Sequence, residues 1–130
     1  MAITPTLGWI VLYVNDVTAS AAMYEAAFGL DVAFAHPDGD YTEFATGTTA
    51  LALCATSLAE KSTATPLAER GAPGGNITLV VDDVAAAFER AVAAGCWARV
   101  APATKPWGQV SSYVADVDGN LIELASPVDR

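Results

Sequence analysis

The side chains best suited to chemistry in this sequence are aromatic rings and carboxylates in segments with strand-like alternation. Alternate residues of a strand point to the same side, so the apolar series Ile10, Leu12 and Val14 leaves Trp9 and Tyr13 on the opposite face. The same argument in the other strands gives one set of inward-facing residues. Thr78 is in this set, and the candidate ligand-binding residues within it are Trp9, Tyr13, Tyr41, Glu43, Asn76, Ser111, Tyr113 and Glu123, with Trp107 near the rim. Flat rings suit stacking on a planar ligand, and carboxylates beside them favour a cationic one.

Covalent chemistry has little support in the sequence. The one histidine, His36, precedes Pro37 at the end of a predicted strand and is interpreted as a turn or rim residue. The cysteines, Cys54 and Cys96, lie in no CxxC or Cys/His cluster and are interpreted as small buried hydrophobic residues. We find no Ser–His or Cys–His pair that would activate a nucleophile.

Composition and charge restrict the class of protein. Hydrophobic residues make up 53% of the 130 residues and charged residues 16%, which predicts one domain with a packed core. The net charge of −9 argues against binding to nucleic acid and to anionic membranes. The first ten residues do not resemble a signal peptide, and no apolar stretch is long enough to span a bilayer. We therefore expect a cytoplasmic protein.

An internal repeat predicts the architecture. The segments Gly8–Ala19 (GWIVLYVNDVTA) and Gly75–Ala86 (GNITLVVDDVAA) are identical at seven of twelve positions. Each reads as a strand that leads into a helix and is followed by three more strand-like runs, which gives two βαβββ units.

The boundaries of these elements follow from capping and turn signals. The helices are predicted at Thr18–Phe28, with Asp16 or Thr18 as the cap, and at Val84–Ala94, with Asp83 as the cap; Gly29 and Gly95 end them. The later strands are predicted at Asp31–His36, Tyr41–Thr46, Thr49–Ala55, Trp97–Val100, Gln109–Asp116 and Leu121–Ala125. The intervening segment is rich in Ser, Thr, Pro and Gly and reads as a linker, with a short helical turn at Leu58–Lys61.

Two stretches carry a specific resemblance. Tyr13–Val32 (YVNDVTASAAMYEAAFGLDV) resembles the opening strand and helix of the vicinal oxygen chelate superfamily, which includes glyoxalases, extradiol dioxygenases and bleomycin-resistance proteins. Pro106–Pro127 (PWGQVSSYVADVDGNLIELASP) resembles the closing hairpin of that superfamily. The resemblance implies an α+β fold in which two curved four-stranded sheets with helices outside form a cup. It implies a single domain over residues 1–130, with modules 1–56 and 75–130 and a linker at 57–74, paired either within one chain or by domain swapping.

The resemblance also assigns the positions of metal ligands, two in each half. They fall here on Trp9 and Ala52 in the first half and on Asn76 and Glu123 in the second. Only Glu123 is a standard ligand type, since Trp and Ala cannot coordinate a metal through their side chains. We therefore predict no metal cofactor.

One metal-binding alternative stays open. If Gly47-Thr48 forms a two-residue hairpin loop, Glu43 lies opposite Ala52 and points into the cup. Glu43 and Glu123 could then hold a divalent metal such as Mg²⁺ or Mn²⁺.

The leading hypothesis is a non-catalytic protein that binds a small aromatic or cationic molecule. Loss of metal ligands combined with gain of aromatic residues makes it similar to the bleomycin-resistance and related antibiotic-sequestering proteins, and the resemblance implies a homodimer. The rival hypothesis is an enzyme, a divergent metal-dependent lyase, isomerase or dioxygenase.

Overall fold

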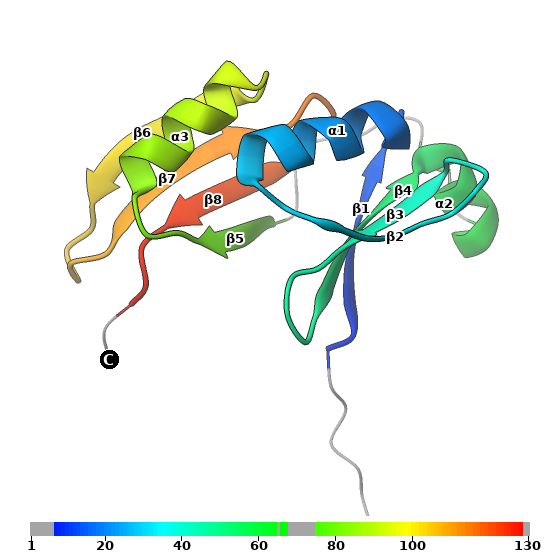
Figure 1. The fold of residues 1–130 in the computed structure, drawn as a ribbon, viewed down its shortest axis with the longest axis horizontal. Coiled ribbons are helices and arrows are strands. Elements are labelled where there is room, and N and C mark those ends of the chain that lie inside the picture. The colour runs from blue at the N-terminus through cyan, green and yellow to red at the C-terminus, as the bar shows by residue number, and fades with distance from the viewer. Residues whose placement is uncertain (1–6, 65, 68–74, 129–130) are drawn as a thin grey trace, which may run out of the picture. The chain divides into compact units, whose positions relative to one another are not determined.

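The computed structural model describes residues 7–64, 66–67 and 75–128, and both halves follow the order β-α-β-β-β, with one further helix between them (Figure 1). The chain forms two compact units, of residues 1–22 with 30–68 and of residues 23–29 with 69–130. We call them unit 1 and unit 2. Each contains one four-stranded mixed sheet, which confirms the predicted α+β class with two βαβββ modules.

The sheet of unit 1 has the strand order β1-β4-β3-β2. Its strands are β1 (Trp9–Val14), β2 (Val32–Ala35), β3 (Tyr41–Phe44) and β4 (Ala50–Ala55). Strand β1 runs parallel to β4, and the other pairs are antiparallel. Buried Leu51, Leu53 and Phe44 share one face, as their register requires. Glu43 is paired with Ala52, which is the register that a two-residue loop at Gly47-Thr48 predicts.

Helix α1 (Val17–Phe28) has one buried stripe at helical spacing. The buried residues are Val17, Ser20, Ala21, Tyr24 and Ala27. Of the two candidate caps, Asp16 is the one used, because its Oδ1 accepts a 3.0 Å hydrogen bond from the amide of Ala19. Gly29 follows the helix with a φ of 68°, the left-handed conformation predicted there.

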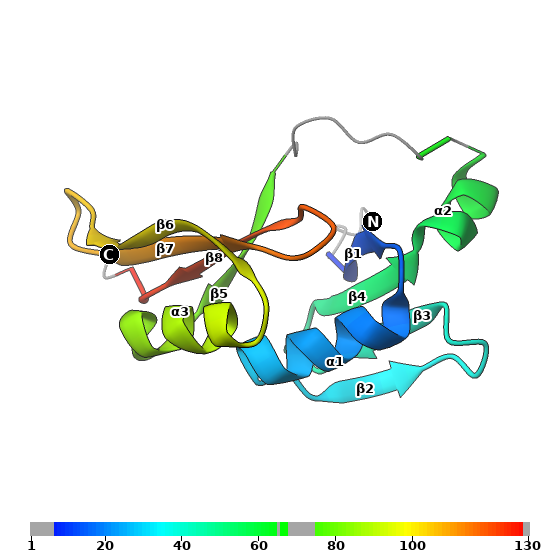
Figure 2. The same ribbon diagram turned by 90° about the horizontal axis from the view of Figure 1, so that it is seen from above.

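The sheet of unit 2 has the corresponding order β5-β8-β7-β6. Its strands are β5 (Asn76–Val80), β6 (Trp97–Thr104), β7 (Val110–Ala115) and β8 (Leu121–Ala125). Helix α3 (Val84–Ala93) lies along one face of this sheet and contacts β6, β7 and β8 (Figure 2). Asp83 caps α3 as predicted, because its side chain accepts a 3.0 Å hydrogen bond from the amide of Ala86.

The second half of α1 belongs to unit 2. The hydroxyl of Tyr24 donates a 2.7 Å hydrogen bond to Asp116 in the turn between β7 and β8, and both residues are buried. Arg90 of α3 donates from its Nε to the carbonyl of Ala26 at 2.9 Å. Burial, together with the charge and hydrogen bond of Asp116, raises the pKa of Tyr24 well above its ordinary value, so the phenol keeps its proton and remains a donor.

Two segments differ from the sequence prediction. The sixth strand was predicted to end at Val100, but β6 continues to Thr104 and contains Pro102. The proline is tolerated because β6 is an edge strand, and the register of β6 against β7 shifts on both sides of Val100. The predicted turn at Leu58–Lys61 is part of a longer helix, α2 (Thr56–Thr63). Residues 65 and 68–74 of the predicted linker lie outside the described residues.

Within the described residues, every helix is too short or too polar to cross a bilayer.

Candidate ligand-binding site

Three side chains converge on one face of the unit 1 sheet. The indole Nε1 of Trp9 on β1 donates a 3.0 Å hydrogen bond to Oε2 of Glu43 on β3. The hydroxyl of Tyr41 donates to the same oxygen at 2.7 Å. Strand β4 lies between β1 and β3, and the residue it places beside Glu43 is buried Ala52. Because alanine is small, the indole can reach across β4 to the carboxylate.

The Tyr41 phenol is a stable donor. Burial, followed by the hydrogen bond and negative charge of Glu43, raises the pKa of Tyr41 to about 12. The phenol therefore keeps its proton at neutral pH and continues to donate. Both donors use Oε2, and no described residue donates to Oε1 of Glu43.

Hydroxyl groups surround the carboxylate of Glu123 on the sheet of unit 2. Thr78 of β5 donates from its Oγ1 to Oε1 of Glu123 at 2.7 Å, and Ser111 of β7 donates from its Oγ to Oε2 at 2.6 Å. The hydroxyl of Tyr113, which is paired with Glu123 across β7 and β8, also forms a hydrogen bond with it. Asn76 donates from its Nδ2 to Oγ1 of Thr78 at 3.2 Å. Both oxygens of Glu123 are thus engaged.

These hydroxyls keep Glu123 ionised. Burial alone would raise the pKa of Glu123, but the hydrogen bonds from Ser111, Thr78 and Tyr113 and the charge of Lys105 outweigh it, so the pKa lies below its usual value. The pKa of Tyr113 is raised by burial and then by the charge and hydrogen bond of Glu123. At neutral pH this face therefore presents a fixed negative charge held by neutral donors.

The two sheets place their carboxylates on different strands. In unit 1 the residue of β4 paired with Glu43 is Ala52. In unit 2 the residue of β8 paired with Tyr113 is Glu123. Ala52 and Glu123 therefore occupy the same position in the two modules, as the alignment of their last strands predicts, and Glu43 corresponds to Tyr113.

Tyr13 and Trp107 are the remaining predicted site residues. Tyr13 is half-buried on β1 and is paired with Cys54 of β4. Trp107 is exposed in the turn between β6 and β7, where its Nε1 donates a 3.0 Å hydrogen bond to the side chain of Gln109. Trp107 belongs to this hairpin and not to the hydroxyl cluster around Glu123.

Thr78 was predicted to face inward, but it was not among the predicted ligand-binding residues. The alternation of side chains along a strand indicates the inward direction, because Thr78 follows Asn76 by two positions and so shares its face. Its bond to Glu123 depends on the parallel pairing of β5 with β8, which places Thr78 and Glu123 side by side.

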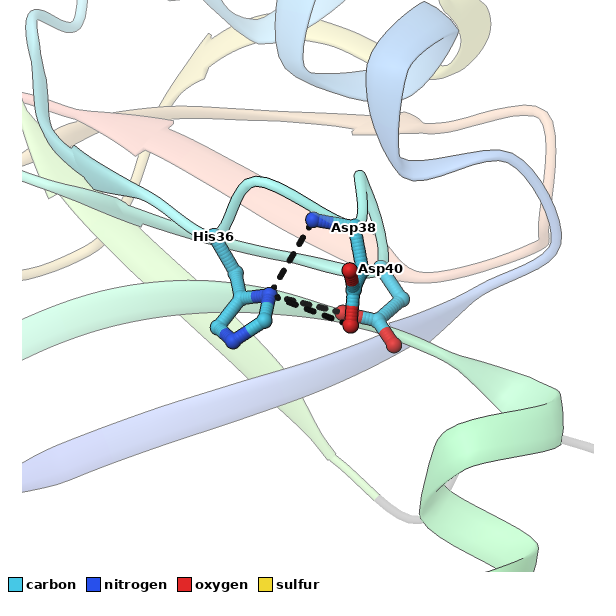
Figure 3. Close-up of side chains that lie close together, drawn as sticks. All are labelled: His36, Asp38 and Asp40. Carbon is cyan, nitrogen blue, oxygen red and sulfur yellow. Dashed lines mark hydrogen bonds and ion pairs between the residues drawn. The ribbon is translucent and has the colours of Figure 1, made fainter.

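His36, which the sequence places in a turn, lies beside two carboxylates. In the turn between β2 and β3, its Nδ1 lies 3.6 Å from Oδ2 of Asp38 and 3.8 Å from Oδ1 of Asp40 (Figure 3). These three atoms lie within 4.8 Å of one another, a spacing that a metal ion could bridge. However, Nδ1 already accepts a 3.1 Å hydrogen bond from the amide of Asp38, so its lone pair serves the turn.

The four positions that the resemblance assigns to metal ligands do not fit a divalent metal. Trp9 and Ala52 offer no ligand atom, and Asn76 uses its amide nitrogen as a donor to Thr78. Glu123 alone supplies a carboxylate, and both of its oxygens accept hydrogen bonds from hydroxyl groups. A hard cation needs several oxygen ligands, and this set does not provide them.

Residues 6–124 match the family model described as the Glyoxalase/Bleomycin resistance protein/Dioxygenase superfamily. The chain belongs to this superfamily. No significant match to a curated protein is found.

Solved structures of the superfamily resemble the chain over most of its length. A glyoxalase-related enzyme from Fulvimarina pelagi is 26% identical, with a TM-score of 0.83 over 95% of this chain and 89% of that one. A family enzyme from Burkholderia phytofirmans PsJN is 19% identical, with a TM-score of 0.84 over 94% and 98% of the two chains. A lactoylglutathione lyase from Agrobacterium tumefaciens is 26% identical, with a TM-score of 0.71 over 95% of both chains. These similarities establish the fold, and the match to the family model establishes the superfamily.

Proposed function

We propose that this superfamily member is a non-catalytic protein that binds a small organic ligand, in the manner of antibiotic-sequestering proteins. The observation that carries the proposal is the indole of Trp9. It stands at a position where metal-dependent relatives have a ligand, and it is hydrogen-bonded to Glu43. Trp9 is 58% exposed and therefore offers a flat apolar surface beside a carboxylate.

The described side chains favour binding over covalent catalysis. Burial first, and then the charge of Asp116, raises the pKa of Cys96 to about 11, and burial also raises the pKa of Cys54. Both thiols are therefore poor nucleophiles at neutral pH. His36 is engaged in its turn and is not hydrogen-bonded to a serine or cysteine among the described residues.

The same proposal includes the assembly and location that the sequence analysis predicts. A cytoplasmic homodimer suits a sequestering protein, and the exposed apolar side chains of Trp9 and Val11, which share one face of β1, are the kind of surface that a ligand or a second subunit would cover.

Metal analysis combined with a ligand screen tests this function. We expect the dialysed protein to hold less than stoichiometric metal and to show quenching of tryptophan fluorescence with at least one antibiotic or planar aromatic compound. Trp9→Ala should weaken that binding by about 1–3 kcal/mol if the indole is a stacking anchor. Trp97→Ala is the matched control, because Trp97 is also exposed on a strand but lies outside the predicted site.

The rival function is a metal-dependent lyase, isomerase or dioxygenase. Glu123, which stands at a ligand position, and the similarity to a lactoylglutathione lyase favour it. Metal retained at one ion per chain through dialysis, together with turnover of a hemithioacetal or a catechol that Glu123→Gln abolishes, would replace the binding proposal with this one.

A further inference from the structure

We propose that the face formed by Trp9, Tyr41 and Glu43 binds an organic ammonium ion, which rests on the proposed binding function and specifies its ligand class. The ligand would place its charged nitrogen against Oε1 of Glu43 and an N-methyl or methylene group against the indole of Trp9.

The hydrogen bonds orient the carboxylate for such a ligand. Trp9 and Tyr41 both donate to Oε2 of Glu43, at 3.0 and 2.7 Å. These two bonds fix the direction of the carboxylate and leave Oε1 without a donor among the described residues. The bond from Trp9 uses the edge of the indole and not its face, and the residue is largely exposed, so the ring can contact a cation.

The charges of unit 1 favour a cation over a neutral ligand. Glu43 forms no ion pair with a described residue. Unit 1 contains six acidic residues: Asp16, Asp31, Asp38, Asp40, Glu43 and Glu60. Its one Lys or Arg is Lys61, which lies on α2 and forms no ion pair with Glu43. A cation bound at Glu43 would therefore supply the counter-charge that the protein does not.

The donor set distinguishes an organic cation from a metal ion. A metal needs several acceptor atoms around it, but the indole and the phenol beside Glu43 present N–H and O–H donors to the carboxylate. An alkylammonium ion needs one carboxylate and an apolar or aromatic surface, which is what this face offers.

Trp97 gives an internal comparison. The guanidinium carbon of Arg99 lies 5.7 Å from the centroid of the Trp97 ring, so the protein's own cation already occupies that position. No cation–π contact to Trp9 is found among the described residues, although Trp9 is exposed to a similar extent. The described residues therefore supply no cation to the ring of Trp9, and its exposed side chain is open to one from a ligand.

The test compares three small probes that share a phenyl ring and differ in charge: the cation benzyltrimethylammonium, the neutral benzyl alcohol and the anion benzoate. The indole N–H signals of the three tryptophans are followed by ¹⁵N NMR at physiological salt, which screens non-specific attraction to the acidic surface. We expect benzyltrimethylammonium to shift the Trp9 signal and to bind about tenfold more tightly than benzyl alcohol. Benzoate should not bind.

Two variants and a charge-matched control complete the experiment. Glu43→Gln keeps the size of the side chain and its acceptor oxygen, and it should abolish the preference for the cation. Trp9→Phe should weaken cation binding several-fold. The control is Glu89→Gln, which makes the same change of charge at an exposed position on α3, and it should change neither the affinity for the cation nor the preference for it. Thermal denaturation verifies that each variant is folded.

The inference is overturned if the cation and the alcohol bind equally, if Glu43→Gln keeps the preference, or if the shifts occur at Trp97 or Trp107. It is also overturned if benzyltrimethylammonium does not bind. None of these results removes the proposed binding function, which falls separately if the antibiotic and aromatic screen yields no ligand.

Discussion

The phenol of Tyr24 donates a 2.7 Å hydrogen bond to Asp116, a residue 92 positions further along the chain. Asp116 is 1% exposed, and its Oδ1 also accepts from the amides of Asp118 and Asn120 at 2.9 and 2.8 Å. The carboxylate thus organises the turn between β7 and β8 and attaches the second half of α1 to it.

Removing the Tyr24 hydroxyl should destabilise the protein. Tyr24→Phe leaves a buried carboxylate with one donor fewer, and we expect the free energy of unfolding to fall by about 1–3 kcal/mol in urea denaturation. Tyr41→Phe, whose hydroxyl serves a half-buried carboxylate, should cost less. Equal midpoints for Tyr24→Phe and the parent protein would show that the bond does not contribute.

The pKa of Tyr41 should depend on the negative charge of Glu43. The pKa of Tyr41 is about 12 in the folded protein, above its ordinary value of 10.0, so Tyr41 contributes stability below pH 10 that is lost as the pH rises through about 12. Glu43→Gln should lower this pKa towards 10 while burial keeps part of the shift, and the alkaline loss of stability should shrink. Absorbance titration of tyrosinate, with Tyr41→Phe to assign the signal, measures the effect; an unchanged pKa in Glu43→Gln would contradict it.

Ser111→Ala should raise the pKa of Glu123. The hydrogen bond from Ser111 favours the ionised carboxylate, whose pKa is lowered from 4.5 in the folded state. A lowered pKa contributes stability above pH 4.5 that is lost as the pH falls through the folded value, so the variant should lose part of this contribution. The carboxyl carbon shift in ¹³C NMR follows the titration. Ser112→Ala is the control, because Ser112 donates to the carbonyl of Leu124 instead.

Gly95 should not tolerate a side chain. It ends α3 with a φ of 113°, and a Cβ there would lie 3.3 Å from Cε of Met23. Gly95→Ala should cost at least about 1–2 kcal/mol of unfolding free energy, because an L-residue is strained in this conformation. At Gly8 a Cβ would meet nothing within 4 Å, so Gly8→Ala is the matched control in thermal denaturation. A similar small effect in both variants would argue against strain at Gly95.

Local signals in the sequence predicted most of the fold. The repeated strand–helix segment gave the number of modules, Asp83 gave a cap, and Gly29 and Gly95 gave helix ends, because each of these depends on a few neighbouring residues. The continuation of β6 through Pro102 to Thr104 was not predicted. A proline is tolerated in a strand at the edge of a sheet, and edge position is a property of the whole sheet.

The sequence predicted which face of each sheet carries the candidate site residues, but it did not predict which side chains contact one another. The alternation of side chains along the strands predicted that Trp9 and Glu43 lie on the same side of their sheet. The expected hairpin register predicted that Glu43 lies beside Ala52. The bond from Trp9 to Glu43 could not be predicted, because it depends on the small size of a third residue on the strand between them. The role of Thr78 likewise required the parallel pairing of β5 with β8, which connects distant segments.

Helix α1 is one continuous element, yet its residues up to Ala22 belong to unit 1 and those from Met23 to unit 2. The two repeated halves of the sequence therefore do not correspond to two independent structural units. A fragment that begins at Gly75 would lack the phenol that serves Asp116 and the carbonyl that Arg90 uses. A chimera that grafts the second half onto a relative must carry residues 23–29 with it.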